Sequence, residues 1–248
     1  MYILKQQNMK KTLLPIITSL LFISCSLKKG YVKYGQKEDQ IIVSDNIKKY
    51  LKENPNPSIV LRVPLASSGA ILDDNNLYIY NAIEKELLLA GFNVKDRGLF
   101  TEVMNRATVI NYSQINELTK ADLILELVKV EDRIPFYTNK IYTDKDEEKV
   151  SNNYTITRYG KLIEFKLVMV KTNEYGGNFS FIYTPCSEKS SDCNCTVLYK
   201  NYTPVRFYYD KNPCKGKGKK IAFEDIPHDK FELFLRNGIK KMVSEIRK

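Results

Sequence analysis

The stretch that decides the fold begins DDNNLYIYNAIEKELLLAGFNVKDRGLFTEVM, residues 73–104. Apolar side chains recur three and four positions apart over residues 77–90, which predicts a helix with one buried stripe. Asp73 and Asp74 precede that run and offer carboxylates to the unpaired N–H groups of its first turn. Gly91 follows the last periodic residue, where a left-handed cap favours a residue without a Cβ. We therefore expect a helix that ends in a tight turn at Gly91.

Strand patterns lie on both sides of this helix. Residues 92–96 alternate between apolar and polar, and helical spacing returns over residues 99–104 and 113–118. The run ADLILELVKV, residues 121–130, is apolar enough for a central strand, and SIVLRVPL, residues 58–65, is a similar run upstream. The order strand, helix, strand, helices, strand predicts an α/β fold in which a mixed sheet is flanked by helices.

The second half of the chain predicts antiparallel strands and a closing helix. Residues 154–171 form a strong strand pattern, Gly176 and Gly177 are a turn signal, and residues 178–183 are the return strand of a hairpin. Apolar spacing over residues 229–248 predicts a C-terminal helix that lies on the sheet.

Length and composition favour one domain over two. With 248 residues and 43% hydrophobic content the chain can bury one core, and we assign a single domain to residues 57–248. Two polar stretches are interpreted as insertions in it: residues 131–153, as a long loop or a hairpin, and residues 184–220, which include an alternating segment over 196–209. Residues 25–56, polar and Lys-rich, are interpreted as a tether with one weak helix.

The first residues have the pattern of an export signal. A pair of lysines precedes an apolar core, residues 12–23, which is short for a bilayer span, and Ser24 precedes Cys25. A small residue directly before a cysteine resembles the lipobox of bacterial lipoproteins. That resemblance implies removal of residues 1–24 and two or three acyl chains on Cys25, which hold a protein stably at a membrane.

Two points about this segment stay open. The chain starts at Met1 or at Met9, which gives the more ordinary positive region. The alternative to lipidation is a plain secretory signal or an N-terminal membrane anchor in which Cys25 is incidental. Ser26 is not the aspartate that retains many lipoproteins at the inner membrane, so the resemblance implies an outer-membrane anchor with the domain facing the periplasm.

The chain is basic, with a formal net charge of +10. Three lysines lie in the export signal, which leaves +7 on the mature part. A basic surface suits nucleic acid, anionic lipid head groups or cell-wall polymers. Because an exported protein does not meet nucleic acid, we expect none as a partner.

Four cysteines lie in the second half of the mature chain. In an exported chain four cysteines favour two disulfides, with three possible connectivities. Cys193 and Cys195 are too near in sequence to pair with each other, so each is expected to pair with Cys186 or Cys214. A zinc site is disfavoured by the spacing and by the oxidising compartment. The four residues are Cys186, Cys193, Cys195 and Cys214.

The residues that usually carry catalysis are sparse. His228 is the only histidine and is interpreted as an exposed residue at a helix start. Ser67 and Ser68 lack the G-x-S-x-G pattern of a nucleophile elbow. The basic run at residues 215–220 lacks the Gly-Lys-Ser/Thr ending of a phosphate-binding loop. We therefore predict a non-enzymatic protein without a metal, a cofactor or a small-molecule substrate.

The stretch around Gly91 is similar to a known family. It resembles the core of the CsgG-like superfamily of bacterial lipoproteins, whose α/β domain is related in fold to the N-terminal domain of TolB. The matching pattern is a helix that ends in a small residue and Gly, a short strand, Asp-Arg, a helix, and then Ala-Asp before an apolar strand. The residues that carry it are Leu89, Ala90, Gly91, Val94, Asp96, Arg97, Leu99, Phe100, Val103, Ala121 and Asp122.

The resemblance implies a three-layer domain in which Gly91, Asp96 and Arg97 have structural roles. It also implies a lipid-anchored accessory or assembly component of a cell-envelope complex, which acts by self-association or by binding a protein partner. The alternative within the family is a subunit of an oligomeric outer-membrane secretion pore. From the residues alone, Asp96 and Arg97 are interpreted as a modest surface ion pair.

Overall fold

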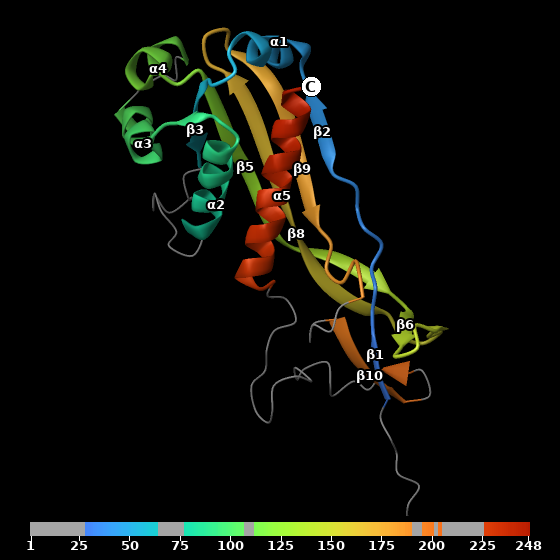
Figure 1. Cartoon of the computed structure of the whole chain (residues 1–248). Coiled ribbons are helices and arrows are strands. Elements are labelled where there is room, and N and C mark those ends of the chain that lie inside the picture. Colours follow the sequence, from blue (N-terminus) through green and yellow to red (C-terminus); the bar gives the residue numbers. More distant parts are fainter. Residues whose placement is uncertain (1–27, 64–76, 107–111, 190–194, 201–202, 205–225) are drawn as a thin grey trace, which may run out of the picture.

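Two β-sheets organise the chain into two lobes (Figure 1). We name the larger the α/β lobe, which holds a six-stranded sheet and the helices, and the other the small lobe, which holds a five-stranded sheet. The computed structural model describes residues 28–63, 77–106, 112–189, 195–200, 203–204 and 226–248. Cys25, Ser67, Ser68, Cys193, Cys214 and residues 215–220 lie outside these ranges.

The six-stranded sheet is mixed, as the sequence predicts. Its strand order is β2-β9-β8-β5-β3-β4, and β3 is parallel to both neighbours while the remaining pairs are antiparallel. The strands are β2 (Gln40–Val43), β3 (Ser58–Arg62), β4 (Asn93–Val94), β5 (Leu123–Thr138), β8 (Ile156–Met169) and β9 (Glu174–Tyr183).

Helices cover both faces of this sheet and make three layers. On one face lie α1 (Asp45–Glu53), α2 (Leu77–Leu89) and α5 (His228–Ile246), and on the other lies α3 (Arg97–Arg106) with α4 (Tyr112–Thr119) beside it. These findings confirm the α/β fold with a C-terminal helix. No helix among the described residues combines the length and the apolar character that a membrane span needs.

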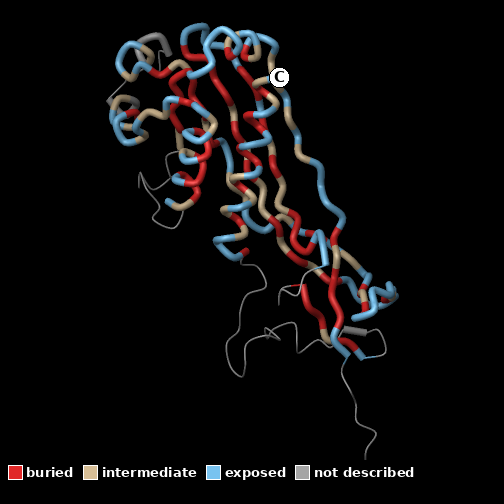
Figure 2. The backbone as a smooth tube through the Cα atoms, viewed as in Figure 1, coloured by how far each residue is buried: buried red, intermediate tan, exposed pale blue. Residues whose placement is uncertain are grey.

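The side chains of β5 alternate between the two faces of the sheet, which explains why there is an apolar core on each face. Leu123, Leu125 and Leu127 face the layer of α1, α2 and α5, where they are fully or almost fully buried. Ile124 faces the other way and packs with Phe100 of α3. Successive side chains of a strand point to opposite faces, so an aliphatic run is what a sheet covered on both sides requires. Figure 2 shows the buried positions continuing along the strands of this lobe.

The small lobe has its own sheet, in the order β11-β10-β1-β6-β7. Its strands are β1 (Lys28–Tyr31), β6 (Lys140–Thr143), β7 (Glu148–Val150), β10 (Thr196–Lys200) and β11 (Thr203–Pro204). The far ends of β5 and β8 reach into it, because Phe136 and Ile156 belong to its core. Long arms of one hairpin therefore join the two lobes.

The prediction of a tether over residues 25–56 is wrong for the part that the structure describes. β1 pairs with β6 and β10, β2 pairs with β9, and α1 buries Ile47 and Leu51. The pairing partners lie more than a hundred residues further along the chain, so no local pattern in residues 28–56 announces them.

The insertion over residues 131–153 is a hairpin in its second half and a continued strand in its first. β5 runs through to Thr138, eight residues beyond the end of the predicted strand, and β6 and β7 then pair with each other. The loop alternative is therefore excluded for this segment. Charged side chains are compatible with these strands because they lie on exposed positions, as Glu148 does.

The turn predicted at Gly176 and Gly177 is wrong. The chain turns at residues 170–173, where Asn173 has a φ of 54°, and both glycines lie inside β9. Gly177 pairs with Leu167 and Tyr175 with Val168, which leaves Gly176 as the extra residue of a bulge. A Cβ on Gly177 would lie 2.7 Å from the carbonyl oxygen of Ile42, so glycine permits the close approach of β2.

Candidate functional site

Gly91, Asp96 and Arg97 shape the connections around β4. Gly91 has a φ of +86° and ends α2, as predicted. The carboxylate of Asp96 accepts a hydrogen bond from the backbone N–H of Leu99 at 2.7 Å, which caps α3. The Arg97 guanidinium lies 3.4 Å from the Glu84 carboxylate. The expected ion pair between Asp96 and Arg97 is therefore wrong, since each residue has another structural role.

Asp122, the second residue of the Ala-Asp pair, ties the starts of two parallel strands together. Its carboxylate accepts hydrogen bonds from the backbone N–H and the hydroxyl of Ser58, at 2.9 and 2.6 Å. Burial raises the pKa of the neighbouring Tyr50 to about 12, and the Asp122 charge adds to that rise. This cluster holds β3 beside β5 and is structural.

A disulfide joins Cys186, which follows β9, to Cys195, which precedes β10. It agrees with the expectation that Cys195 pairs with either Cys186 or Cys214. The backbone N–H groups of Val32 and Tyr34 donate to the carbonyl oxygens of Cys195 and Cys186. The bridge therefore fastens the small lobe around the segment that follows β1.

The remaining candidates for chemistry do not converge. His228 is exposed at the start of α5, as predicted, and its ring stacks on Tyr78 with centroids 4.5 Å apart. Within the residues that the structure describes, no group of three or more His, Cys, Asp or Glu side chains could hold a metal ion.

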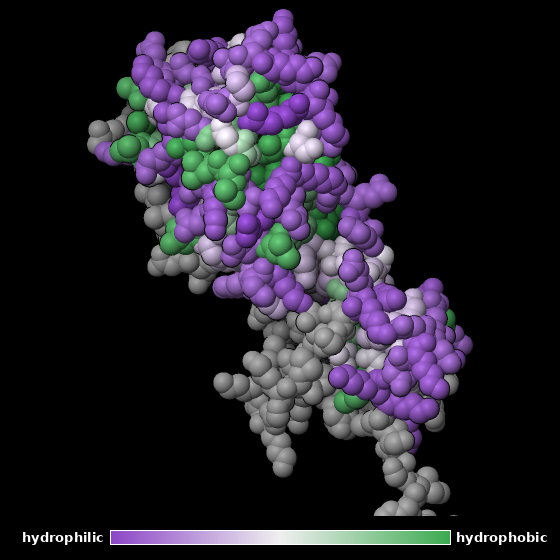
Figure 3. Space-filling view, in the orientation of Figure 1, coloured by the Kyte–Doolittle hydropathy of each residue, from purple (hydrophilic) through white to green (hydrophobic). Residues whose placement is uncertain are grey.

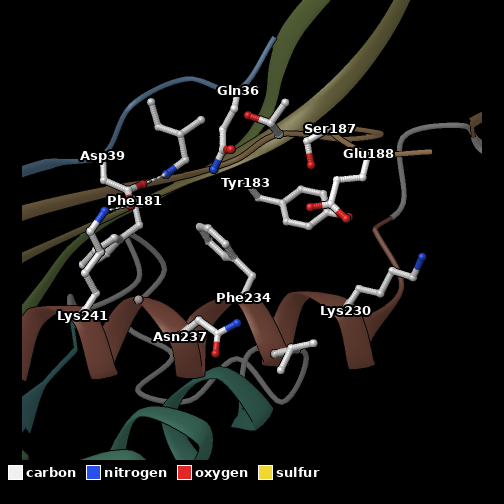
Figure 4. Close-up of a pocket in the computed structure, with 14 residues that line it drawn as sticks. Gln36, Asp39, Phe181, Tyr183, Ser187, Glu188, Lys230, Phe234, Asn237 and Lys241 are labelled. Atoms are coloured by element: carbon white, nitrogen blue, oxygen red, sulfur yellow. Dashed lines mark hydrogen bonds and ion pairs between the residues drawn. The ribbon is translucent and has the colours of Figure 1, made fainter. Parts of the chain in front are cut away.

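A groove of about 540 Å³ lies beside α5 on the surface of the α/β lobe (Figure 4). We name it the α5 groove. One wall is the exposed side of α5 from Lys230 to Lys241, and the other is the end of β9 with the segments before β2 and after β9. Three parts of the chain that are distant in sequence thus form it, which explains why sequence patterns did not reveal it.

Aromatic and aliphatic side chains line the middle of the α5 groove. The rings of Tyr183 and Phe234 meet edge to face with centroids 5.5 Å apart, and Leu233 is 57% exposed at the rim. Gly238 lets the helix approach the sheet, since a Cβ there would lie 3.2 Å from the ring of Phe181. Burial raises the pKa of Tyr183, and the charge of Asp229 adds to the rise.

Charged groups of both signs stand at the two ends of the α5 groove, as Figure 4 shows. At one end Asp39 pairs with Lys241 at 2.8 Å, and at the other lie Glu188 and Lys230. Asp39 also accepts a hydrogen bond from the backbone N–H of Ile182 at 3.3 Å. That contact occupies the edge of β9 beyond the end of β2, so it opposes strand addition there.

A second apolar surface lies on three other helices of the lobe. Exposed leucines gather on α2, α3 and α4, and Figure 3 shows apolar side chains over this region. They are more than half exposed: Leu88, Leu89, Leu99 and Leu118. Sequence analysis placed Leu99 and Leu118 in the apolar spacing of their helices, and the structure leaves both side chains exposed.

Comparisons with known proteins find similar solved structures but assign no family to the chain. No family model matches the chain, and no curated protein matches it. A hypothetical protein, CT253, from Chlamydia trachomatis shares 8% identity at a TM-score of 0.33, covering 77% of this chain and 96% of that one. A putative neuraminyllactose-binding hemagglutinin homolog from Helicobacter pylori shares 13% identity at a TM-score of 0.32, covering 78% and 84%. Likeness at this level assigns neither a family nor an activity.

Proposed function

We propose that the chain is a non-enzymatic, lipid-anchored protein of the bacterial cell envelope that binds a protein partner in the α5 groove. In this proposal the acyl chains on Cys25 fix it to the outer membrane, and the domain works in the periplasm as an assembly or accessory component. The observation that carries the proposal is the α5 groove itself. The resemblance to CsgG-like lipoproteins supports the same function.

The composition of the α5 groove favours a protein as its occupant. Aromatic residues are enriched in protein interfaces, and charged rims surround their apolar centres. The groove has this arrangement, with Phe234 in the middle, Leu233 at the rim and the Asp39–Lys241 pair at one end. Ends that carry both signs of charge suit a polypeptide segment with its own mixture of side chains.

The position of the first described strand supports membrane attachment at the small lobe. Lys28 opens β1 at the end of the small lobe that is farthest from α1 (Figure 1). Cys25 lies only three residues earlier, and three residues reach at most about 11 Å. A lipid on Cys25 would therefore hold the small lobe at the bilayer and present the α5 groove away from it.

The experiment replaces Leu233 by Glu in the chromosomal copy of a host strain. Leu233 is exposed, so the variant is expected to fold and to reach the membrane fraction normally. A charge at the rim of the groove opposes an apolar partner surface, and we expect the phenotype of a deletion strain. The matched control is Leu118→Glu on α4, which is also more than half exposed and lies elsewhere. Wild-type behaviour of Leu233→Glu, or equal defects in both variants, contradicts the proposal.

A second function is favoured by the exposed leucines on α2, α3 and α4. Apolar surface of this kind suits contacts between copies of one chain, as an oligomeric outer-membrane secretion pore requires. Native mass measurement after mild solubilisation separates the two functions. An accessory protein is expected as a monomer or small oligomer, whereas a large detergent-stable ring favours the pore.

A further inference from the structure

A basic hollow opens at the end of the small lobe, where the described chain begins. It measures about 500 Å³, and three lysines line it: Lys28 and Lys29 from β1, and Lys145 from the turn between β6 and β7. We name this surface the lysine tip. All three side chains are exposed, so their ammonium groups are available to an external partner.

Close packing of the backbone brings these lysines together. A Cβ on Gly30 would lie 2.6 Å from the carbonyl oxygen of Tyr142, so only glycine lets β1 approach β6 this closely. The hydroxyl of Thr143 accepts hydrogen bonds from the backbone N–H groups of Lys145 and Glu147, at 3.3 and 3.2 Å. These contacts fix the turn that carries Lys145.

The tip lysines differ from the other lysines of the small lobe in their pairing. Lys140 pairs with Glu148 at 2.8 Å, and Lys189 pairs with Asp146 at 2.8 Å. The three tip lysines have no carboxylate within ion-pair distance among the residues that the structure describes. The tip lysines therefore form no ion pair within the described part of the fold.

Two carboxylates also line the hollow and must be counted against the lysines. Glu147 already pairs with Lys149 at 3.2 Å, whereas Asp144 stands among the tip lysines. With Lys149 included, the surface keeps an excess of two positive charges. A partner that gathers several negative charges in one plane would be attracted to this surface.

We infer that the lysine tip is a membrane-contact surface that binds the anionic head groups of phospholipids. The inference rests on the proposed lipid anchor, because Cys25 lies three residues before Lys28 and so delivers this surface to the bilayer. A lysine near an anionic membrane strengthens attachment by a factor of about five. The lysine tip thus sets the orientation of the molecule, with the small lobe on the head groups and the α/β lobe directed away.

The test follows the processed protein, expressed from the full chain, in competition between two kinds of vesicle. One kind is phosphatidylcholine alone, and the other contains about one third phosphatidylglycerol. The acyl anchor is the same in both, so the ratio of bound protein isolates the lysines. We expect a preference for anionic vesicles of roughly twenty-five-fold, the value for an excess of two charges, lost at high salt and lost when Lys28, Lys29 and Lys145 are all changed to Gln.

The matched control changes Lys48, Lys49 and Lys52 of α1 to Gln. This variant loses the same charge at the opposite end of the molecule and is expected to keep the preference. Equal behaviour of the two variants overturns the inference, and so does a wild-type protein that binds both vesicles alike. Salt-sensitive binding to anionic vesicles alone supports the lysine tip but overturns the lipid anchor. Binding to neither vesicle overturns both.

Discussion

The two lobes are held together in different ways. The α/β lobe buries a large continuous core between its sheet and three helices, which includes Phe165, Leu87 and Ile239. The small lobe has a short core around Phe136 and Ile141, and it adds a disulfide between Cys186 and Cys195. A sheet with little apolar surface to bury gains most from a covalent link. Among the described residues, the disulfide therefore stabilises the small lobe, whereas the α/β lobe is held by its apolar core alone.

The largest effect is expected from truncating one phenylalanine in each core. Phe165→Ala should lower the free energy of unfolding by about 4 kcal/mol, since its ring is almost fully buried in the large core. Phe136→Ala should lower it by about 2 kcal/mol, because a small core collapses more easily around a cavity. Denaturant unfolding followed by circular dichroism measures both. A larger loss for Phe136→Ala would reverse the comparison.

Removal of the disulfide is expected to destabilise the small lobe and to leave the α/β lobe unchanged. Replacing Cys186 and Cys195 together by Ala opens a loop with a sequence separation of 9 and should cost about 2 to 3 kcal/mol. Amide hydrogen exchange should become faster in β1, β6 and β10 and stay unchanged in β5 from Leu123 to Leu127. Equal acceleration in both lobes would mean that they unfold as one unit.

Substitution of two aspartates, one in each lobe, is expected to lower the stability by a smaller amount. Asp96→Ala removes the side-chain cap of α3 and should cost about 1 kcal/mol, while Asp96→Asn should restore most of it. Asp146→Ala should cost less, because Asp146 and its partner Lys189 are both exposed and ion pairs at the surface contribute little. Thermal unfolding of the three variants ranks their losses of stability. A larger loss for Asp146→Ala than for Asp96→Ala would contradict the comparison.

The smallest expected effect is a response to alkaline pH that both lobes share. Burial raises the pKa of Tyr31 to about 12, with help from Asp146, and burial with Asp122 does the same for Tyr50. The folded state thus keeps these protons while the unfolded chain loses them near its ordinary value of 10.0. Their contribution to stability is complete below pH 10 and is lost as the pH rises through 12.

Tyrosinate absorbance measures this response. Tyr31→Phe and Tyr50→Phe should each remove one late-titrating group from the curve of the wild type. If Tyr50→Phe has this effect and Tyr31→Phe does not, the two lobes differ in a way that the structure does not account for.

Local signals in the sequence predicted the α/β lobe well. The periodic stripe that ends at Gly91 and the aliphatic run at residues 121–130 became α2 and the first part of β5. Both rest on contacts between near neighbours or on burial from two sides, which composition reveals. The C-terminal helix followed for the same reason.

Sequence analysis did not predict the small lobe, the α5 groove or the lysine tip, because all three depend on contacts between residues that are distant in sequence. β1 is recognisable only through its pairing with β6 and β10, and Gly30 matters only because Tyr142 lies against it. The lysine tip likewise combines Lys29 with Lys145, which no spacing rule connects. Spacing left Cys186 and Cys214 as the two possible partners of Cys195, and the structure pairs Cys195 with Cys186.

The intact mass of the mature protein, purified from its native membrane fraction, tests the central claim most directly. We expect a polypeptide that begins at Cys25 and carries two or three acyl chains, with Cys25→Ser absent from the membrane fraction. A chain that still begins at Met1 or Met9, or one that begins at another residue without acyl chains, would contradict the claim.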